Sequence, residues 1–523
     1  MLSPTRPIGA DIVAMFLSLS AVLVSYLVAE RIYEGLPHIE DEMAYSWQAQ
    51  VYASGQLTIP SPKYPSNFMI PSVVDYQGQR FAKYPPGWPM MLAFGLRLGI
   101  RNWVNPLLAG LAVWLTYRLG QKLFGRSQGM LAAFLTTVSP FFLMNTASLM
   151  SHTWALVLTL AFAISWLDTF SAPPLGTQRE KNNQFVNWTQ HAADVPPKWM
   201  TGIVAGLSLG NLVLVRPLTA LGVAIVFFIH GLILLCSSDQ VVRVRVLSVY
   251  LLAMAVGTLL MVWQFAITGN LWLNPYILWV KYDSVGFGPG HGPVPGGHTL
   301  RYALLYLKPR LYKTLLDVFG WGDISWLFLP VGLWAMRKNY HAWLIAALPL
   351  GLVIVYLAYW VSYGTRYYFE GLPGFTLTTA VGILSLIDWI HRKKHIWHFM
   401  RSLLTSIFVL ALFAQNLLSF LPHRLNSMYH LYNIGLSRLE PFQTEQAQAL
   451  TPALVLVHVE SSWTDYGSLL DLENPWLNSP FIFAISGNRL VNEELVAFYH
   501  DRNIIDFYPN RPLHFDMRRA AKK

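Results

Sequence analysis

The amino-acid sequence predicts an all-α polytopic membrane protein of about eleven transmembrane helices, followed by a small C-terminal α/β domain. Of its 523 residues 54% are hydrophobic and 12% are charged, about half the charge of an ordinary soluble domain. Apolar runs such as 10–29 and 341–360 have the ~20 residues that a helix needs to cross ~30 Å of hydrocarbon. The last hundred residues are polar, which predicts a separate domain outside the membrane.

The membrane domain is predicted to cover residues 1–420. Its expected spans are 10–29, 103–123, 129–148, 153–170, 199–215, 217–236, 246–268, 318–336, 341–361, 368–390 and 400–420. With the N-terminus inside, basic clusters such as Arg392–Lys394 lie on the cytoplasmic side, as the positive-inside rule requires. This orientation holds if the stretch 84–100 does not span. The prolines in Tyr84–Pro89 favour an interfacial or re-entrant helix there.

The chain is predicted to lie in an inner or plasma membrane. The predicted orientation places its polar loops outside. These are a loop at 30–102, a loop at 269–317 and the domain at 421–523. Within that domain the pattern predicts strands at 453–459, 481–485 and 503–508 and a helix at 493–499. The net charge of +10 is explained by membrane orientation, so no nucleic-acid partner is expected. The single cysteine, Cys236, excludes an intramolecular disulfide.

Consecutive acidic residues, Glu40, Asp41 and Glu42, follow soon after the first span. Carboxylates at this depth are costly unless they are solvated, paired or used, which makes them candidates for a functional site. Two other readings stay open. The acids face water in a hydrated loop, or Asp41 caps the amides of a helix predicted at 45–52.

Cations in two further outer segments are candidate anion ligands. Lys83 precedes Tyr84-Pro85-Pro86-Gly87-Trp88, a stretch stiffened by prolines and suited to the wall of a binding site. Arg216 lies between two spans, where burying an arginine side chain costs free energy. Its guanidinium can bind a phosphate in a bidentate way. The alternative for Arg216 is that its side chain extends along apolar surface so that the guanidinium reaches the membrane–water interface.

Several short motifs, in this order, resemble those of the GT-C glycosyltransferases, in the branch of the protein O-mannosyltransferases and the lipid A aminoarabinose transferases. Asp41-Glu42-Met43-Ala44-Tyr45 is similar to the Asp-Glu-x-x-Tyr pattern of their first outer loop, and Lys83–Trp88 to the element after it. The segments 105–125, 214–220 and 363–370 also resemble this superfamily. The resemblance extends over residues 10–390.

The resemblance implies a sugar donor linked to polyprenyl phosphate, a glycan, lipid or protein acceptor on the outer face, and inversion at the sugar carbon. It implies that Asp41 is the general base, with Glu42 as second choice for the base or for a metal or acceptor contact. Fixed cations are expected at the departing phosphate. The expected phosphate ligands are Lys83, Arg216, Arg301 and Arg366, and the expected substrate contacts are Tyr45, Tyr84, Tyr367 and Glu370.

The outer loop at 269–317 contains the glycine- and proline-rich segment 286–298 and is expected to be mobile and to close over the donor. His291 and His298 are weak candidates for binding a divalent metal together with an acid of the first loop, because their seven-residue spacing is no zinc signature. Solvent exposure of both is the alternative. The sequence has no P-loop and no strand-associated Gly-x-Gly-x-x-Gly, which favours a lipid-linked donor over a nucleotide sugar.

Two other kinds of membrane protein would share many of these features. A transporter or flippase is the main alternative, but it would tend to show internal repeats and ionisable groups near mid-membrane. Here the charges lie at the ends of the predicted spans. An oligosaccharide ligase or polymerase would also use external arginines, yet the early Asp-Glu pattern fits the monosaccharide transferases better.

Overall fold

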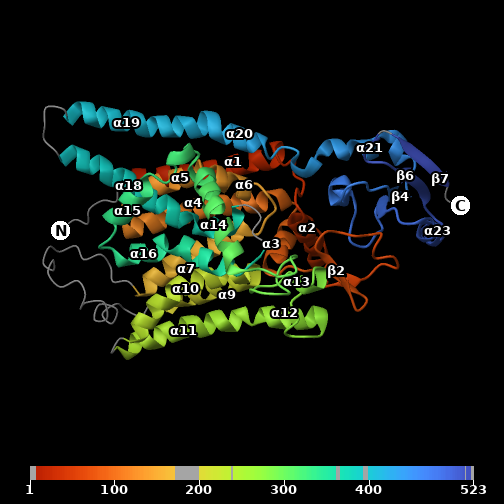
Figure 1. Cartoon of the computed structure of the whole chain (residues 1–523), viewed down its shortest axis with the longest axis horizontal. Helices are drawn as coiled ribbons and strands as arrows, with labels where there is room; N and C mark the ends of the chain where they lie inside the picture. The colour runs from red at the N-terminus through yellow and green to blue at the C-terminus, as the bar shows by residue number, and fades with distance from the viewer. Residues whose placement is uncertain are drawn as a thin grey trace.

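A computed structural model describes residues 8–170, 199–236, 239–360, 365–392, 398–512 and 514–519. It has a bundle of helices and, at one end of the long axis, a smaller domain with strands (Figure 1). The longer unbroken helices are α1 (Ile8–Arg31), α4 (Val104–Leu123), α7 (His152–Phe170), α9 (Trp199–Val215), α10 (Pro217–Leu235), α18 (Leu372–Arg392) and α19 (His398–Gln415). Their core contains fully buried aromatic side chains, among them Trp88, Phe141 and Trp166. Tyr363, Gly364, Lys393 and Lys394, used in the sequence predictions, lie outside the described residues.

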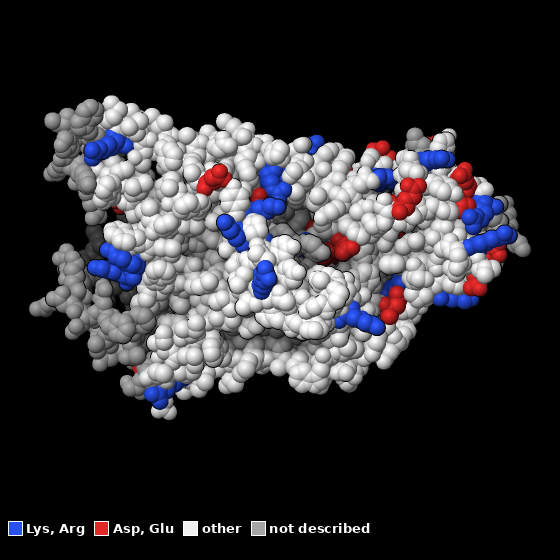
Figure 2. Space-filling model, viewed as in Figure 1, with Lys and Arg blue, Asp and Glu red and all other residues white. Residues whose placement is uncertain are grey.

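The helical part is a multi-pass membrane domain. Within the described ranges, 6 helices are long and apolar enough to cross a membrane, or up to 8 if each bent pair is one span. The prediction of eleven spans is therefore not confirmed. On the face shown in Figure 2, charged side chains gather at one end of the bundle, around its middle and on the C-terminal domain, with few on the wide areas between.

Two predicted spans are bent helix pairs. The stretch predicted at 129–148 is α5 (Arg126–Thr137) and α6 (Pro140–Thr146), which meet at 62°. Pro140 has no N–H to continue α5, and the Ser139 side chain accepts a hydrogen bond from the Phe142 N–H, so a new helix begins there. A hydropathy average along the sequence does not detect such a bend, because the two helices are apolar together.

The predicted span at 318–336 corresponds to the second arm of a bent helix pair. Helix α14 (Leu300–Phe319) ends where Gly320 adopts a left-handed conformation with φ +68°, a common way to stop a helix. The chain then turns by 97° into the segment 322–335, which contains α15 (Phe328–Ala335). Consequently residues 300–317, expected in a mobile loop, are helical. The remaining apolar helices are α11 (Gln240–Gly257), α12 (Leu259–Thr268), α16 (Tyr340–Ala346) and α17 (Leu348–Tyr356).

Between α1 and α4 lies the first loop, residues 32–103, in which helices were predicted at 45–52 and within 84–100 but a sheet was not. It contains α2 (Glu40–Ala53), a sheet of order β1-β3-β2, and α3 (Gly87–Arg97). The strands are β1 (Ile59–Pro60), β2 (Val73–Tyr76) and β3 (Gln79–Ala82), and the sheet is antiparallel. Helix α3 has 11 residues and rises only about 16 Å. It is too short to cross ~30 Å of hydrocarbon alone.

The C-terminal domain has a four-stranded sheet of order β5-β4-β6-β7. Its strands are β4 (Ala453–Val457), β5 (Phe481–Ile485), β6 (Asn503–Phe507) and β7 (Phe515–Arg519); β7 alone is antiparallel to its neighbour. Alternate residues of β4 face opposite cores, with Val455 on one side and Leu454 on the other. Helix α23 (Arg489–Phe498) contributes Leu495 to the second core. The predicted α/β domain is thus confirmed.

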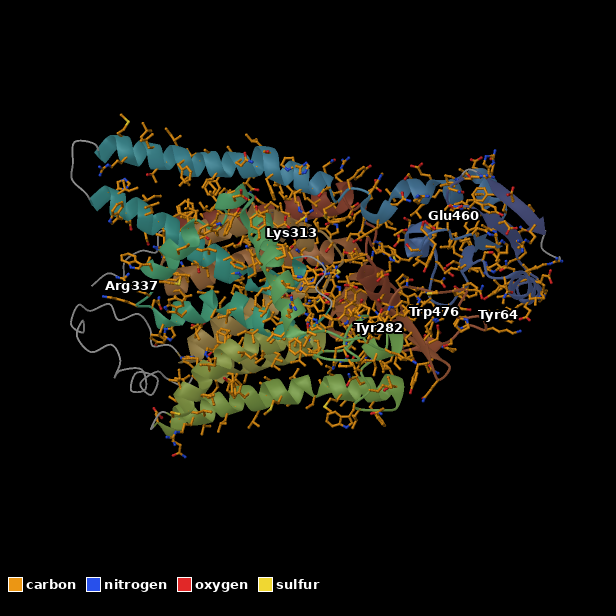
Figure 3. The ribbon with its side chains drawn as sticks, viewed as in Figure 1. Tyr64, Tyr282, Lys313, Arg337, Glu460 and Trp476 are labelled. Atoms are coloured by element: carbon orange, nitrogen blue, oxygen red, sulfur yellow. The ribbon has the colours of Figure 1, made fainter. Side chains whose placement is uncertain are left out.

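The C-terminal domain contacts the first loop through several polar pairs. The Asn67 carbonyl accepts the Ile485 N–H at 2.6 Å and the Asn67 side chain donates back to the Ile485 carbonyl at 2.8 Å, so the first loop covers the end of β5. Arg101 forms an ion pair with Asp471 at 2.8 Å. Trp476, labelled in Figure 3, donates to Gln56 at 3.3 Å. The two segments are therefore joined at several points.

Candidate active site

A cavity of about 570 Å³ lies between α2, the α9–α10 corner, α17 and the segment 269–299, which we call the glycine-rich loop. This volume is in the range of small-molecule sites. Its lining contains most of the residues predicted for the site and a large share of aromatic side chains. They include Glu40, Asp41, Tyr45, Lys83, Tyr84, Arg216, Trp263, Tyr276, Asp283, Tyr356, Tyr359, Arg366 and Tyr367.

Asp41 lies in the first turn of α2 and is bound on both carboxylate oxygens. Tyr84 donates to Oδ1 at 2.5 Å, and Nη2 of Arg366 lies 3.1 Å from Oδ2. Burial raises the pKa of Asp41, but the charge of Arg366 and the hydrogen bond from Tyr84 outweigh it, so the pKa lies below its ordinary value. Asp41 is therefore ionised at neutral pH. Ile39, not Asp41, is the N-cap residue, so the capping alternative does not apply to Asp41.

Arg216 lies in the corner between α9 and α10 and is fixed by its surroundings. It donates to Ser151 Oγ at 3.2 Å, Thr219 Oγ1 at 3.1 Å and the Tyr356 hydroxyl at 3.2 Å. Its side chain is only 12% exposed and lies 3.4 Å from Glu370, which is fully buried. These contacts direct the guanidinium toward the protein interior and the cavity wall, and not toward the membrane surface.

The predicted tyrosines connect the acid and the arginines. The rings of Tyr45 and Tyr84 are 4.6 Å apart, and the Tyr45 hydroxyl is 3.4 Å from Ser151 Oγ, which also contacts Arg216. The Cζ atoms of Arg216 and Arg366 lie 5.9 and 5.6 Å from the centre of the Tyr367 ring. The ring therefore lies close to both guanidinium groups.

Glu42, the second predicted catalytic acid, has a different environment from Asp41. It is 2% exposed and accepts the His38 N–H at 2.6 Å and the Leu149 N–H at 3.0 Å. Burial raises its pKa to about 7. Since consecutive helix residues point in different directions, the acid beside Asp41 in the cavity lining is Glu40, which sequence reasoning did not select. Glu42 instead joins α2 to the segment between α6 and α7.

Other predicted site residues lie away from the lining. Glu370 is buried behind Arg216 and is 3.3 Å from His152 Nδ1. Arg301 is exposed in the first turn of α14, because Thr299 caps that helix and removes Arg301 from the loop. His291 bonds Ser284 at 2.8 Å and His298 bonds the Leu357 carbonyl at 2.8 Å. Over the residues that the structure describes, no three His, Cys, Asp or Glu side chains gather as metal ligands would.

Each cation of the lining has an acidic partner. Lys83 Nζ is 3.0 Å from Asp283 Oδ2, Arg366 is paired with Asp41, and Arg216 lies beside Glu370. Asp283 belongs to the glycine-rich loop and was not predicted as a site residue. No local pattern marks this pair, because its members are 200 residues apart in the chain.

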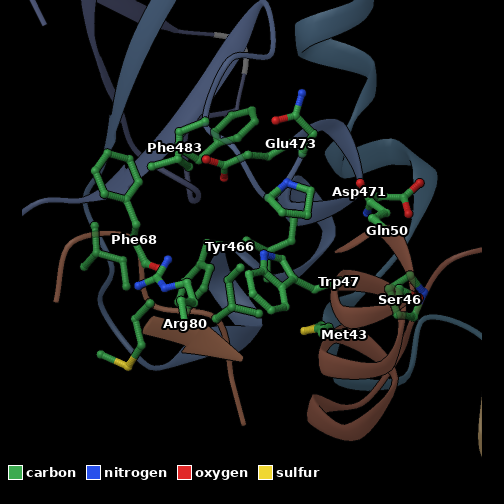
Figure 4. Close-up of a pocket in the computed structure, with 18 of the residues that line it drawn as sticks. Met43, Ser46, Trp47, Gln50, Phe68, Arg80, Tyr466, Asp471, Glu473 and Phe483 are labelled. Atoms are coloured by element: carbon green, nitrogen blue, oxygen red, sulfur yellow. The ribbon is translucent and has the colours of Figure 1, made fainter. Parts of the chain in front are cut away.

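A second, smaller cleft lies on the other side of α2, against the C-terminal domain (Figure 4). Its lining includes Trp47, Phe68, Arg80, Tyr466 and Glu473. Its volume is about 30 Å³, space for one or two water molecules at roughly 15 Å³ each. This cleft is too small for a sugar ring and is separated from the cavity by α2.

The arrangement of helices matches solved structures of membrane glycosyltransferases. The crystal structure of ArnT from Cupriavidus metallidurans bound to undecaprenyl phosphate is similar with a TM-score of 0.55 and 12% identity, over 94% of this chain and 92% of that chain. The apo oligosaccharyltransferase of Archaeoglobus fulgidus gives a TM-score of 0.50 and 11% identity, over 93% and 69%. The chain has the GT-C fold.

The GT-C fold confirms the resemblance predicted from short motifs. No protein-family model and no curated protein matches the sequence. At 11 to 12% identity the likeness concerns the fold, so the chemistry has to be argued from the side chains of this chain.

Proposed function

We propose that the protein is a membrane glycosyltransferase that moves a sugar from a polyprenyl-phosphate-linked donor to a glycan, lipid or protein acceptor. The observation that carries this proposal is a single cavity that joins an ionised carboxylate, Asp41, to the cations Lys83, Arg216 and Arg366. A base and fixed positive charge are what transfer from a lipid phosphate requires. The ArnT structure, which holds undecaprenyl phosphate, supports the choice of donor.

In the proposed reaction Asp41 takes the proton of the acceptor hydroxyl while the hydroxyl oxygen bonds to the sugar carbon. The bond between that carbon and the phosphate oxygen breaks on the opposite face, so the configuration inverts. The phosphate leaves with one more negative charge than it had in the donor. Lys83, Arg216 and Arg366 stabilise this charge, and two of them are arginines able to bind phosphate oxygens in pairs.

The donor proposal is tested by thermal stabilisation of the detergent-purified protein with a panel of polyprenyl-phosphate sugars. Free polyprenyl phosphate and the uncharged polyprenol are the controls. A ligand that binds only the folded state raises the melting temperature in a saturable way. If folded protein is stabilised by none of the phosphates, the donor proposal fails and a transporter or flippase becomes the better reading.

The site is proposed to face the extracytoplasmic side of an inner or plasma membrane. Arg337 and Glu460 lie at opposite ends of the molecule (Figure 3). In a Cys236→Ala background, Glu460→Cys should react with a membrane-impermeant maleimide in sealed right-side-out vesicles, and Arg337→Cys only after permeabilisation. The reverse pattern would place the site in the cytoplasm. A divalent metal, for which His291 and His298 are weak candidates, is tested by measuring transfer with and without EDTA.

A further inference from the structure

The ion pair between Lys83 and Asp283 connects the first loop to the glycine-rich loop in the wall of the cavity. The ammonium and the carboxylate are 3.0 Å apart, and the two residues are 8% and 5% exposed. Both line the cavity. Removing two charges from water is costly even when they pair, so this pair contributes little to stability. Its position beside the proposed phosphate site suggests another role.

Lys83 is held by one anion and two rings. Besides Asp283, its Nζ lies 5.0 Å from the centre of the Tyr276 ring and 5.3 Å from that of Tyr84. An ammonium has three N–H donors, and ring faces attract it less strongly than an anion does. A phosphate that enters the cavity therefore meets a lysine whose main partner is Asp283.

Asp283 is fixed independently of Lys83. Its Oδ1 accepts a hydrogen bond from the Tyr359 hydroxyl at 2.7 Å. Next to it, the Gly286 N–H donates to the Ala358 carbonyl at 2.8 Å, and Val285 forms a bridge with Tyr359. The carboxylate would thus keep its place and one partner if Lys83 turned away. Lys83 can leave Asp283 by rotation about the bonds of its flexible side chain alone.

The arginines of the cavity do not have to leave their acids in this way. A guanidinium has five N–H donors in a planar fork, so it can hold a carboxylate and a phosphate together. Arg216 keeps Ser151, Thr219 and Tyr356 as well. Lys83 is the compact charge for which two anions compete.

We propose that Asp283 competes with the lipid phosphate for Lys83: it holds the ammonium in the free protein, yields it when a polyprenyl phosphate binds, and takes it back as that product leaves. This inference rests on the proposed function. Asp283 would be a positioning residue that acts through Lys83. It weakens binding of free polyprenyl phosphate and so speeds its release after transfer.

The test is the affinity of Asp283→Asn for undecaprenyl phosphate. Asparagine keeps the shape and an oxygen that can accept from Tyr359, but removes the charge. The Kd should fall at least about tenfold, because the Lys83 ammonium no longer has to leave a partly buried carboxylate in order to bind the phosphate. Damage to the fold would weaken binding, so a gain in affinity separates competition from a structural role. The kcat should fall if product release limits turnover.

Three controls fix the interpretation. In a Lys83→Gln background, Asp283→Asn should change the Kd less than about twofold, because the contested cation is gone. Undecaprenol should bind Asp283→Asn and the unchanged protein equally. Tyr359→Phe, which keeps the Asp283 charge, should not tighten binding.

Unchanged or weaker phosphate binding in Asp283→Asn would overturn the inference, and so would an equal gain in the Lys83→Gln background or for undecaprenol. Failure of the unsubstituted protein to bind any polyprenyl phosphate would instead remove the proposed function. The two failures are therefore distinguishable in one set of titrations.

Discussion

The Arg366 guanidinium lies 3.1 Å from one oxygen of Asp41 while Tyr84 donates to the other oxygen at 2.5 Å. The carboxylate is thus oriented by groups from two segments more than 280 residues apart in the chain. Both partners favour its ionised form. With 23% of its side chain exposed, Asp41 still has a free path to a substrate in the cavity.

Asp41→Asn should reduce transfer by about 10²- to 10⁴-fold, the usual contribution of a general base. The change removes a proton acceptor and almost no volume, so the affinity for a polyprenyl-phosphate sugar should stay within about twofold. Single-turnover kinetics and a binding titration on the same preparation check both parts. Full activity in the folded variant would exclude Asp41 as the base, and Glu40 would be the next acid to replace.

Arg366→Gln should move the acid limb of the kcat/KM profile to higher pH. Burial raises the pKa of Asp41 and Arg366 opposes this, so without Arg366 the pKa rises. A general base works in its ionised form, so if Asp41 is the base the unsubstituted protein should keep activity at lower pH than the variant. Arg301→Gln serves as the matched control, because Arg301 is exposed and outside the cavity lining. A profile that moves equally in both variants would argue against this pairing.

Arg216→Ala should weaken binding of free polyprenyl phosphate by about 10- to 100-fold, the equivalent of the ~1.5–3 kcal/mol of hydrogen bonds to a charged group. It should leave the binding of uncharged polyprenol unchanged. Isothermal titration in detergent measures both ligands. Equal loss for the alcohol and the phosphate would mean that Arg216 supports the cavity and does not contact phosphate.

Glu42→Gln should affect stability more than chemistry. The folded pKa of Glu42 is about 7 against an ordinary 4.5, so the folded state holds its proton where the unfolded state has lost it. Stability from this group therefore falls as pH rises from about 4.5 to about 7. Over this pH range the melting temperature should change less with pH for Glu42→Gln than for the unsubstituted protein. At the acid end it should be lower for Glu42→Gln, because the backbone N–H of His38 or of Leu149 loses its acceptor. Identical slopes would show that Glu42 does not hold this proton.

The sequence predicted those parts of the fold that depend on local pattern. Hydropathy located α1, α4, α7 and α10 to within a few residues, and alternation located β4 and β5. The bends at Ser139 and Gly320 were missed because the apolar run continues through each of them. The short strands of the first loop were missed because a three-stranded sheet of this size leaves little periodicity in the sequence.

The candidate site was predictable where a residue carries its own chemical signal. Arg216 between two spans and Asp41 after a span both gave such a signal, and both line the cavity. The choice between Glu40 and Glu42 depends on which side of α2 faces the cavity. The selection of Asp283 depends on a contact with Lys83, which is 200 residues away in the chain. Neither can be read from neighbours in the chain.

The contact between Asn67 and Ile485 also sets the order in which the protein can be completed during synthesis. The first loop leaves the ribosome hundreds of residues before β5, yet its residues 64–68 pack on the second face of the C-terminal sheet. Until that sheet exists, Asn67 has no Ile485 to bond and Phe68 has no apolar core to enter. We therefore expect a chain that stops before β5 to insert its helices but to leave this part of the first loop uncovered.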